Sequence, residues 1–255
     1  MEIKVMTFNL RVDVAADGVN YFPNREHRVL ETILTEKPDL IGFQEAANYA
    51  RAYLKSKLSE DYVIVGCGRN ELYRGESCMI AFRKDRFELV NFSTRFLSTT
   101  PNVPGSRYAE SDQSSCPRTY VHAELSMNDR PGLIHFYNTH LDHKGEQARF
   151  LGMTQILGDL TEAQGPVILT GDMNARPDQP CMRMPLTVGS RPLKEATADI
   201  RHTFHNFGKI GSDTPVKIDY IFTDAEVVNA YAVADDPADG VYISDHFPVC
   251  AILDL

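Results

Sequence analysis

Tryptophan, paired cysteines and long apolar runs are missing from this chain. There is no tryptophan among its 255 residues, although 13 phenylalanines and 11 tyrosines can supply aromatic packing. The five cysteines are odd in number and include no CxxC pair, which argues against a disulfide framework and a cysteine zinc site. No apolar run approaches membrane-spanning length, so we expect no membrane partner. No signal-like stretch precedes the first predicted strand, so we expect a cytoplasmic protein; a secreted or periplasmic chain trimmed of its leader would look the same.

Positive charge is also scarce. The sequence has 26 Lys and Arg against 35 Asp and Glu, a formal net charge of -9. Duplex DNA binding requires many neutralised phosphates, so we do not expect a broad basic surface for it. The hydrophobic fraction of 43% is enough for a sizeable core, and no polar linker separates two cores. We therefore expect residues 1–255 to form one domain and the chain to be a monomer.

Short apolar runs and a few amphipathic stretches predict a mixed α/β chain. Strands are expected at 3–10, 40–44, 62–65, 78–82, 87–92, 120–125, 133–139, 167–170, 218–223, 227–234 and 249–253. Helices are expected at about 25–37, 49–58 and 147–160. In the last of these we expect Phe150, Leu151, Thr154 and Leu157 to face inward. Residues 98–117 and 173–215 are predicted to be long loops, which are usually functional in compact domains.

The order of these elements contains a weak internal echo. A strand, a helix, an apolar strand and an acidic residue follow one another in 8–45 and again in 137–172. This repetition predicts two similar halves whose strand ends face one cleft. Mixed short strands with few helices favour two packed sheets with helices outside.

Polar residues stand where the predicted strands end. Asp172 and Asn174 follow an apolar strand in LTGDMN. Asp245 and His246 precede the last strand in SDHFPV, and Glu45 ends another in IGFQE. Each motif has a plainer explanation, because Gly, Asp and Asn favour turns and acidic residues favour helix starts. Their shared position, where the rigid scaffold meets the loops, favours a functional role.

Weaker candidates have the same placement. Asn9 ends the first strand in MTFNL, and His140 ends another in NTHLD. Asp219 lies in the apolar strand IDYIF, where a carboxylate needs a partner. His246 is the natural one, because carboxylates orient imidazoles. Arg118 in PRTYV is either a surface charge or a phosphate ligand that uses its planar fork.

These groups share one chemistry. Glu45 and Asp245 suit Mg²⁺ or Mn²⁺, because such cations take oxygen ligands. Asp172 can orient or deprotonate a water, while Asn9 and Asn174 can bond phosphate oxygens or help to hold the metal. The imidazoles can stabilise charge or protonate a leaving oxygen. Together the residues predict a phosphoryl-transfer site.

The motifs MTFNL, GFQE, NTHLD, LTGDMN, IDYIF and SDHFPV, in this order and spacing, closely resemble the endonuclease/exonuclease/phosphatase family. The resemblance runs from Met6 to about Val249. It implies a four-layer α/β sandwich in which two mixed β-sheets pack together and helices cover both outer faces. It also implies a hydrolase that cleaves phosphate esters with a divalent metal.

The resemblance further implies a role for each matching residue. Glu45 corresponds to the principal metal ligand, helped by Asn9 and Asp245. Asp172 corresponds to the residue that orients or activates the attacking water, and Asn174 to the one that binds the phosphate.

Two histidines complete the implied machinery. His246 resembles the histidine that contacts the scissile phosphate or acts as a base, oriented by Asp219. His140 resembles a proposed general acid, and Glu76 in GESCMIAFRKD fits the acidic residue that pairs with it.

The substrate is less constrained. RFLSTTPNVPGS, CPRTYVHAEL and HTFHNFG resemble the short bacterial metal-dependent hydrolases of the family, which makes Arg118 and His205 candidate pocket residues. We expect His143 to lie on the loop surface. The two long loops are expected to give the cleft a basic rim, formed by Arg107, Arg118 just beyond the first loop, Arg176, Arg183, Arg191, Lys194, Arg201, His202 and His205. Such a rim favours a small or short single-stranded phosphoester over duplex DNA. A nuclease and an inactive phospholigand-binding relative remain the alternatives.

Overall fold

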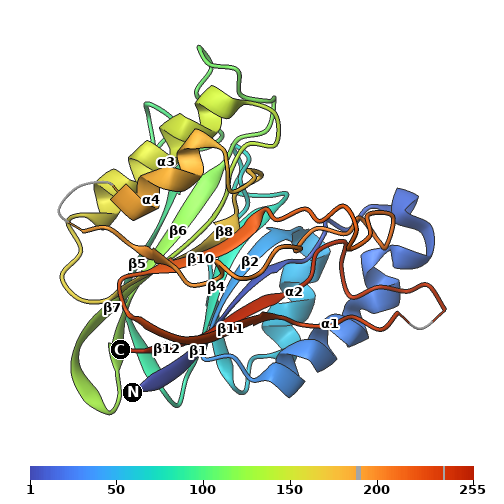
Figure 1. The fold of residues 1–255 in the computed structure, drawn as a ribbon, viewed down its shortest axis with the longest axis horizontal. Helices are drawn as coiled ribbons and strands as arrows, with labels where there is room; N and C mark the ends of the chain where they lie inside the picture. Colours follow the sequence, from blue (N-terminus) through green and yellow to red (C-terminus); the bar gives the residue numbers. More distant parts are fainter. Residues whose placement is uncertain (188–190, 238) are drawn as a thin grey trace.

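The computed structural model describes residues 1–187, 191–237 and 239–255, and its frame is a pair of β-sheets (Figure 1). The strands of the first sheet are β1 (Glu2–Asn9), β2 (Leu40–Ala46), β3 (Tyr62–Val65), β4 (Ser77–Arg83), β11 (Glu226–Ala232) and β12 (Val249–Asp254). Those of the second are β5 (Phe87–Phe96), β6 (Thr119–Met127), β7 (Arg130–His140), β8 (Val167–Asp172), β9 (Lys194–Glu195) and β10 (Asp219–Thr223). The strand orders are β11-β12-β1-β2-β4-β3 and β5-β6-β7-β8-β10-β9.

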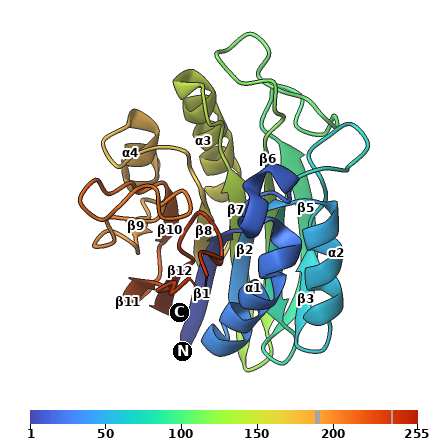
Figure 2. The ribbon, with the colours of Figure 1, turned by 90° about the vertical axis from the view of Figure 1, so that its right-hand side faces the viewer.

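Helices cover the outer face of each sheet. They are α1 (Phe22–Glu36), α2 (Asn48–Lys57), α3 (Glu146–Leu160) and α4 (Pro180–Thr187), with a 3-10 turn at Ala15–Asn20. Figure 2 shows α1 and α2 on one flank and α3 and α4 on the other. One apolar core lies between the sheets, and a separate core lies under each helix pair. The four-layer sandwich of two mixed sheets is therefore confirmed.

Each sheet contains one parallel strand pair joined through a helix. β1 and β2 are parallel and connected through α1, and β7 and β8 are parallel and connected through α3. This arrangement matches the strand–helix–strand echo of the sequence. In the register, Asn9 pairs with Gln44 and His140 pairs with Asp172. Parallel strands end at the same edge of a sheet, so these polar side chains reach one region.

The helical face predicted for α3 was right only at Leu157, which is buried. The helix buries Arg149, Gly152, Met153 and Ile156, whereas Phe150 is 45% exposed. The Arg149 guanidinium donates a hydrogen bond to the backbone carbonyl of Asp142 at 2.9 Å, so its charge is accommodated inside. Gly152 lets neighbouring leucine side chains approach closely. An arginine and a glycine in the buried stripe therefore misdirect a prediction based on hydrophobic periodicity.

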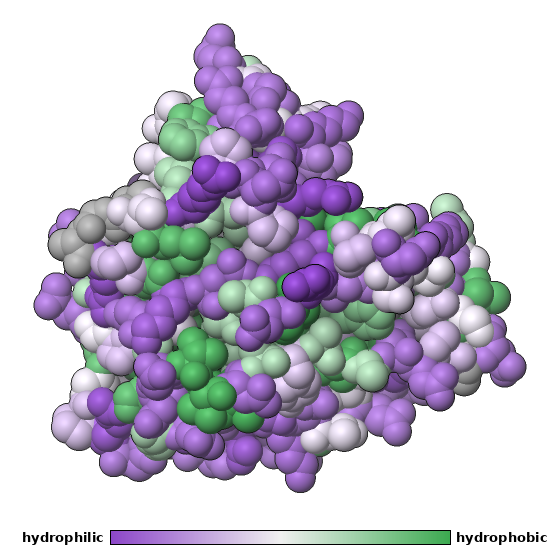
Figure 3. Space-filling model, viewed as in Figure 1, coloured by the Kyte–Doolittle hydropathy of each residue, from purple (hydrophilic) through white to green (hydrophobic). Residues whose placement is uncertain are grey.

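The loop predictions held only in part. Residues 98–117 contain no helix or strand, as expected. The described part of 173–215 includes α4 and β9, which the sequence pattern did not indicate. None of the helices in the described part of the chain is both long and apolar enough to cross a membrane. The face seen in Figure 3 is mostly hydrophilic, with its apolar side chains in small separate patches.

Candidate active site

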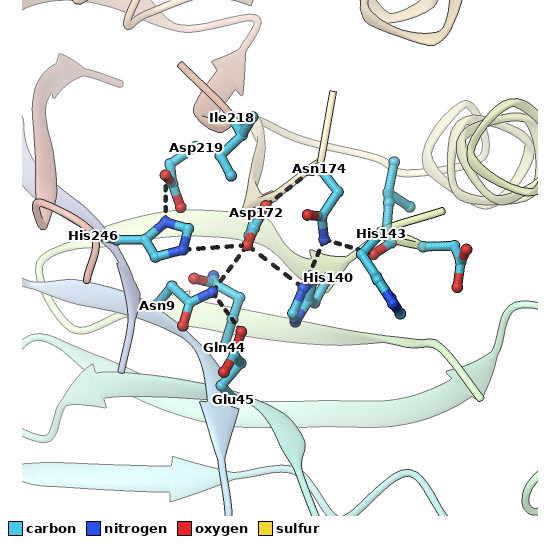
Figure 4. A network of polar contacts seen from close by, with 12 residues as sticks. Asn9, Gln44, Glu45, His140, His143, Asp172, Asn174, Ile218, Asp219 and His246 are labelled. Carbon is cyan, nitrogen blue, oxygen red and sulfur yellow. Dashed lines mark hydrogen bonds and ion pairs between the residues drawn. The ribbon is translucent and has the colours of Figure 1, made fainter. Parts of the chain in front are cut away.

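Asp172 lies at the centre of a buried polar cluster at the strand ends (Figure 4). Asn9, from the other sheet, donates its side-chain amide to Asp172 Oδ2 at 2.9 Å and to Glu45 Oε1 at 3.1 Å. The backbone N–H of Asn174 donates to Asp172 Oδ1 at 2.8 Å. Asp172 is 2% exposed, and both its oxygens are held by donors. The cluster therefore joins the two sheets through a fixed carboxylate.

Glu45 is aimed into the cluster by an irregularity in β2. The β2–β4 register shifts between Phe43 and Ala46, and Glu45 has a left-handed backbone with φ of 58°. Such strain in a non-glycine residue is typical of functional sites. Its Oε2 accepts the backbone N–H of Val12 at 2.8 Å. Burial opposes ionisation, but the Val12 N–H and the charge of His246 outweigh it and lower the pKa of Glu45.

His246 and Asp219 form the predicted pair. His246 Nδ1 donates to Asp219 Oδ2 at 2.8 Å, and both side chains are buried. The other ring nitrogen, Nε2, lies 3.8 Å from Asp172 Oδ2 and 3.9 Å from Asp245 Oδ1. Burial disfavours the imidazolium, yet the carboxylates, Asp219 first, raise the pKa of His246 to about 10. Burial and the charge of Asp219 raise the pKa of Asp172.

His140 lies on the opposite side of Asp172, with its Nε2 3.5 Å from Asp172 Oδ2. The side-chain amide of Asn174 donates to the same Nε2 at 2.8 Å and to the backbone carbonyl of Leu141 at 3.1 Å. Burial and the nearby charge of Arg118 hold the pKa of His140 well below its usual value. The ring is therefore neutral here, and its Nε2 acts as an acceptor.

A recess beside Glu45 is lined by Glu76, His140 and Arg118 among others. Arg118, only 4% exposed, donates from Nη2 to Nδ1 of the exposed His143 at 2.8 Å. Among the described residues, its buried Nη1 has no hydrogen-bond partner. An uncompensated guanidinium N–H in a recess is suited to an anion. His143 lies on the surface, as predicted, but its contact with Arg118 was not foreseen.

Two groups of side chains offer metal-ligating atoms in this region. Glu45, Glu76 and His140 form one, and Asp172, Asp219 and His246 form the other; within each, the atoms lie within 4.8 Å of one another.

Only Asp245 departs from the predicted set of acidic partners. Glu76 stands with His140, as the resemblance implied, but it also forms an ion pair with Arg69. Asp245 does not fall in either group; its Oδ2 lies 3.8 Å from Arg11 Nε. Burial raises the pKa of Asp245 and of Glu76. No motif in the sequence indicated Arg11 or Arg69. Each is recognised only from its contact in the folded chain, with Asp245 and Glu76 respectively.

Two members of the predicted basic rim, Arg191 and Lys194, are paired with acidic residues outside the recess. Arg191 is paired with Asp224, and Lys194 with Glu226, so their charges are used at the edge of the second sheet. His205, a predicted pocket residue, is 2% exposed, and its ring packs against Phe247 and Tyr242. Its Nδ1 accepts the backbone N–H of Gly208 at 3.0 Å. Arg118 therefore brings a buried guanidinium to the recess, with its Nε 3.6 Å from Asp142 Oδ2, while Arg191 and Lys194 do not line it.

Comparison with known proteins places this geometry in a family. A model of the Endonuclease/Exonuclease/phosphatase family matches residues 6–246. The chain belongs to this family. It has the phosphoesterase fold of the endonuclease/exonuclease/phosphatase proteins, with a candidate metal site at its strand ends.

Solved structures of other proteins superpose over the whole chain or nearly all of it. An endonuclease/exonuclease/phosphatase from Bacteroides vulgatus is 28% identical, with a TM-score of 0.92 over 100% of this chain and 99% of that one. A mannosyl-6-phosphatase from Bacteroides thetaiotaomicron VPI-5482 is 23% identical, with a TM-score of 0.84 over 99% and 100%. TDP2 from D. rerio, complexed with a single-strand DNA product, is 18% identical, with a TM-score of 0.76 over 100% and 99%. The last two likenesses concern the fold alone.

Proposed function

We propose that this chain is a Mg²⁺- or Mn²⁺-dependent phosphoesterase in which water attacks a compact phosphate ester. The observation that carries the proposal is the environment of Asp172. Two amides hold this buried carboxylate, and an imidazole lies on either side of it at 3.5 and 3.8 Å. A fixed carboxylate with a raised pKa is suited to accept a proton from water near neutral pH.

The neighbouring side chains support this chemistry. Asp219 orients His246 and keeps it protonated, so His246 can stabilise negative charge on the phosphoryl group. Asn174 is held by His140 and a backbone carbonyl, which fixes its amide beside the same centre. His140, being neutral with Nε2 as an acceptor, carries its proton on Nδ1 and can donate a hydrogen bond from that atom.

The donor set fits a hard divalent cation. Glu45 and Asp245 would hold the metal through carboxylate oxygens, and Asn9, which donates its amide N–H to Glu45 Oε1, would orient the Glu45 carboxylate. The lowered pKa of Glu45 keeps that carboxylate ionised. When bound, such a cation neutralises charge on the phosphoryl oxygens. Arg118 then offers its free Nη1 to a further oxygen of the substrate.

A small phosphoester fits the local charge better than a duplex. Arg118 and Arg69 line the recess, but Asp142 lies 3.6 Å from Arg118 Nε and Glu76 pairs with Arg69, so little net positive charge remains for a long polyanion. A duplex needs many spaced phosphate contacts, and Arg191 and Lys194 do not supply them. The phosphatase and the single-strand complex of the same fold represent the two substrate classes to compare.

The test is a substrate panel with a matched pair of variants. Sugar phosphates, aryl phosphodiesters, single-stranded oligonucleotides and plasmid duplex are incubated with Mg²⁺ or Mn²⁺. We expect the small esters to be cleaved fastest. Asp172→Asn should lose at least ~10² in turnover while still binding substrate, as expected for an acid–base group. Asp61→Asn, which changes an exposed carboxylate, should match the parent.

Three results would contradict the proposal. Efficient nicking of the duplex with the small esters untouched would identify a nuclease. Ligand binding without hydrolysis of any substrate would identify an inactive relative. An Asp172→Asn protein within threefold of the parent would show that the base lies elsewhere.

A further inference from the structure

A second cluster of ligating side chains lies on the outer face of the β5–β6–β7 part of the second sheet. His122 and Glu124 alternate along β6, and His135 and Tyr137 alternate along β7. The residues between them, such as Ala123, enter the core between the sheets, so these four project the other way. Glu124 is directly opposite His135 and His122 opposite Tyr137. Cross-strand pairing therefore places the four side chains together.

This cluster is separate from the candidate active site. His135 precedes His140 by five residues on β7, which is roughly 17 Å of extended strand. The groove around the cluster has a volume of about 220 Å³ and is bounded by β5, β6, β7 and the C-terminal part of α3. Figure 1 shows α3 over the outer side of these strands.

The two imidazoles face each other nitrogen to nitrogen. His122 Nε2 lies 3.0 Å from His135 Nδ1, and His135 Nε2 lies 3.3 Å from the backbone carbonyl of Gln164. A carbonyl only accepts, so His135 Nε2 carries the proton and its Nδ1 lone pair points at His122. A backbone carbonyl on the outer nitrogen is one of the common ways in which a metal-binding histidine is oriented.

A carboxylate completes the group. One ligating atom from each of Glu124, His122 and His135 lies within 4.8 Å of the other two. The side-chain amide of Asn91, on β5, donates to Glu124 Oε1 at 3.2 Å and steadies that carboxylate. Zinc–nitrogen bonds of about 2.0–2.1 Å place two ligating nitrogens roughly 3 Å apart, which is close to the separation here.

An independent observation points to a ligand in the same groove. Tyr137 is fully buried, and its hydroxyl has no hydrogen-bond partner among the described residues. The same tyrosine lines the groove and stacks on His122 with 4.0 Å between ring centroids. A simple hydrogen bond between the histidines satisfies two nitrogens but leaves this hydroxyl unpaired. A cation that carries a water in an open position would give the hydroxyl a partner.

We propose that His122, His135 and Glu124 form a transition-metal site, with Zn²⁺ as its ligand, that links β6 to β7. Two imidazoles and one carboxylate suit Zn²⁺, whereas Mg²⁺ prefers sites made of oxygen atoms. The two cations are therefore expected to occupy different sites on the chain.

The test measures zinc uptake by the full chain in excess Mg²⁺, by equilibrium dialysis and metal analysis. We expect the parent to bind one zinc per chain that His122→Ala loses. In His122→Ala the affinity for this zinc should fall at least ~100-fold, because loss of a group that only supports a ligand costs up to about 100-fold. Glu124→Gln, which keeps the shape of the side chain, should weaken zinc binding less than His122→Ala does. His27→Ala removes an exposed histidine on α1 and should bind like the parent.

Two further readouts separate this site from the cleft. Zinc should raise the melting temperature of the parent more than that of His122→Ala, because binding to the folded state stabilises it. Zinc uptake should survive Asp172→Asn. Equal uptake by the parent and Glu124→Gln, or loss of the zinc in Asp172→Asn alone, would overturn the proposal. If His122→Ala does not fold, the comparison with Glu124→Gln decides the question.

Discussion

Replacing Asp219 with asparagine should disable His246 while leaving the rest of the cluster in place. Asp219 Oδ2 accepts a hydrogen bond from His246 Nδ1 at 2.8 Å, and both side chains are at least 95% buried. Asparagine keeps the shape and an acceptor oxygen but removes the charge. His246 would then lose the group that contributes most to its raised pKa. The imidazolium would be less stable and less firmly oriented.

The size of the effect follows from that contact. A hydrogen bond to a charged group contributes about 1.5–3 kcal/mol. With 1.36 kcal/mol for each factor of ten in rate, Asp219→Asn should lower turnover about 10- to 150-fold. His246→Ala should lower it by at least ~10². If Asp219 acts only through His246, the double variant should be no worse than His246→Ala, so the coupling energy equals the effect of Asp219→Asn.

The assay is a double-mutant cycle on turnover, with the best substrate of the panel and saturating Mg²⁺. Urea unfolding of all four proteins separates a loss of stability from a loss of activity. Asp61→Asn again serves as the carboxylate control. If the free-energy effects of the two single substitutions add to that of the double variant within about 0.5 kcal/mol, the reasoning is refuted. Asp219 would then have a role independent of His246.

Three further predictions test other parts of the site. A chelator should abolish activity, Mg²⁺ or Mn²⁺ should restore it, and Glu45→Ala should need far more metal; full activity in chelator would exclude the metal. Arg118→Ala should raise KM at least ~10-fold, the scale of one lost charged hydrogen bond, without changing the metal requirement. If KM and the metal concentration needed for activity rose together, Arg118 would belong to the metal site instead. Asp142→Asn should lower the free energy of unfolding by about 2 kcal/mol at pH 7, because Asp142 accepts backbone N–H groups of Ser114 and Gly145. These bonds outweigh burial and lower the pKa of Asp142 to about 2. Because this pKa is below its ordinary value of 3.8, the stabilisation is present above pH 4 and is lost as the pH falls toward 2. A stability in Asp142→Asn that falls as steeply as the parent's over that range would contradict this role.

Most of the fold could be predicted from local pattern. Apolar runs of four to eight residues located the main strands, because burial between layers requires them. The echo predicted two similar halves, and in the structure each half contains a parallel strand pair joined through a helix. The buried face of α3 could not be predicted, because Arg149 is stabilised by a carbonyl that only the folded chain brings near. The short helix α4 has a proline inside it, which hides its helical pattern.

The site residues could be predicted where a motif ends a strand. The ion pairs between residues far apart in the sequence could not. Asp172 and Glu45 meet through Asn9, as their strand ends implied. Arg191 and Lys194 read as free basic residues in the sequence, yet each pairs with an acid more than 30 positions away. Nothing local specifies such partners, so net charge in a loop does not predict the charge that faces a cleft.

The division of the site between two sheets makes their relative position part of its geometry. Asn9 and Glu45 come from the first sheet, and Asp172 from the second. Apolar side chains between sheets attract without direction and tolerate small shifts. Hydrogen bonds do not, because they weaken steeply with misalignment.

The two sheets are joined by directional contacts just below the site. The buried side-chain amide of Gln44 donates to Asn138 Oδ1 at 2.7 Å across the interface. Asn138 in turn donates to backbone carbonyls of Phe43 and Met79, both in the first sheet. At Gly42 the sheets approach so closely that a Cβ atom would lie 2.1 Å from the Thr170 hydroxyl. These contacts fix the first sheet against the second sheet at the level of Thr170, two residues before Asp172 on β8. The polar residues between the sheets therefore position the site, and the apolar core supplies the stability that holds them there.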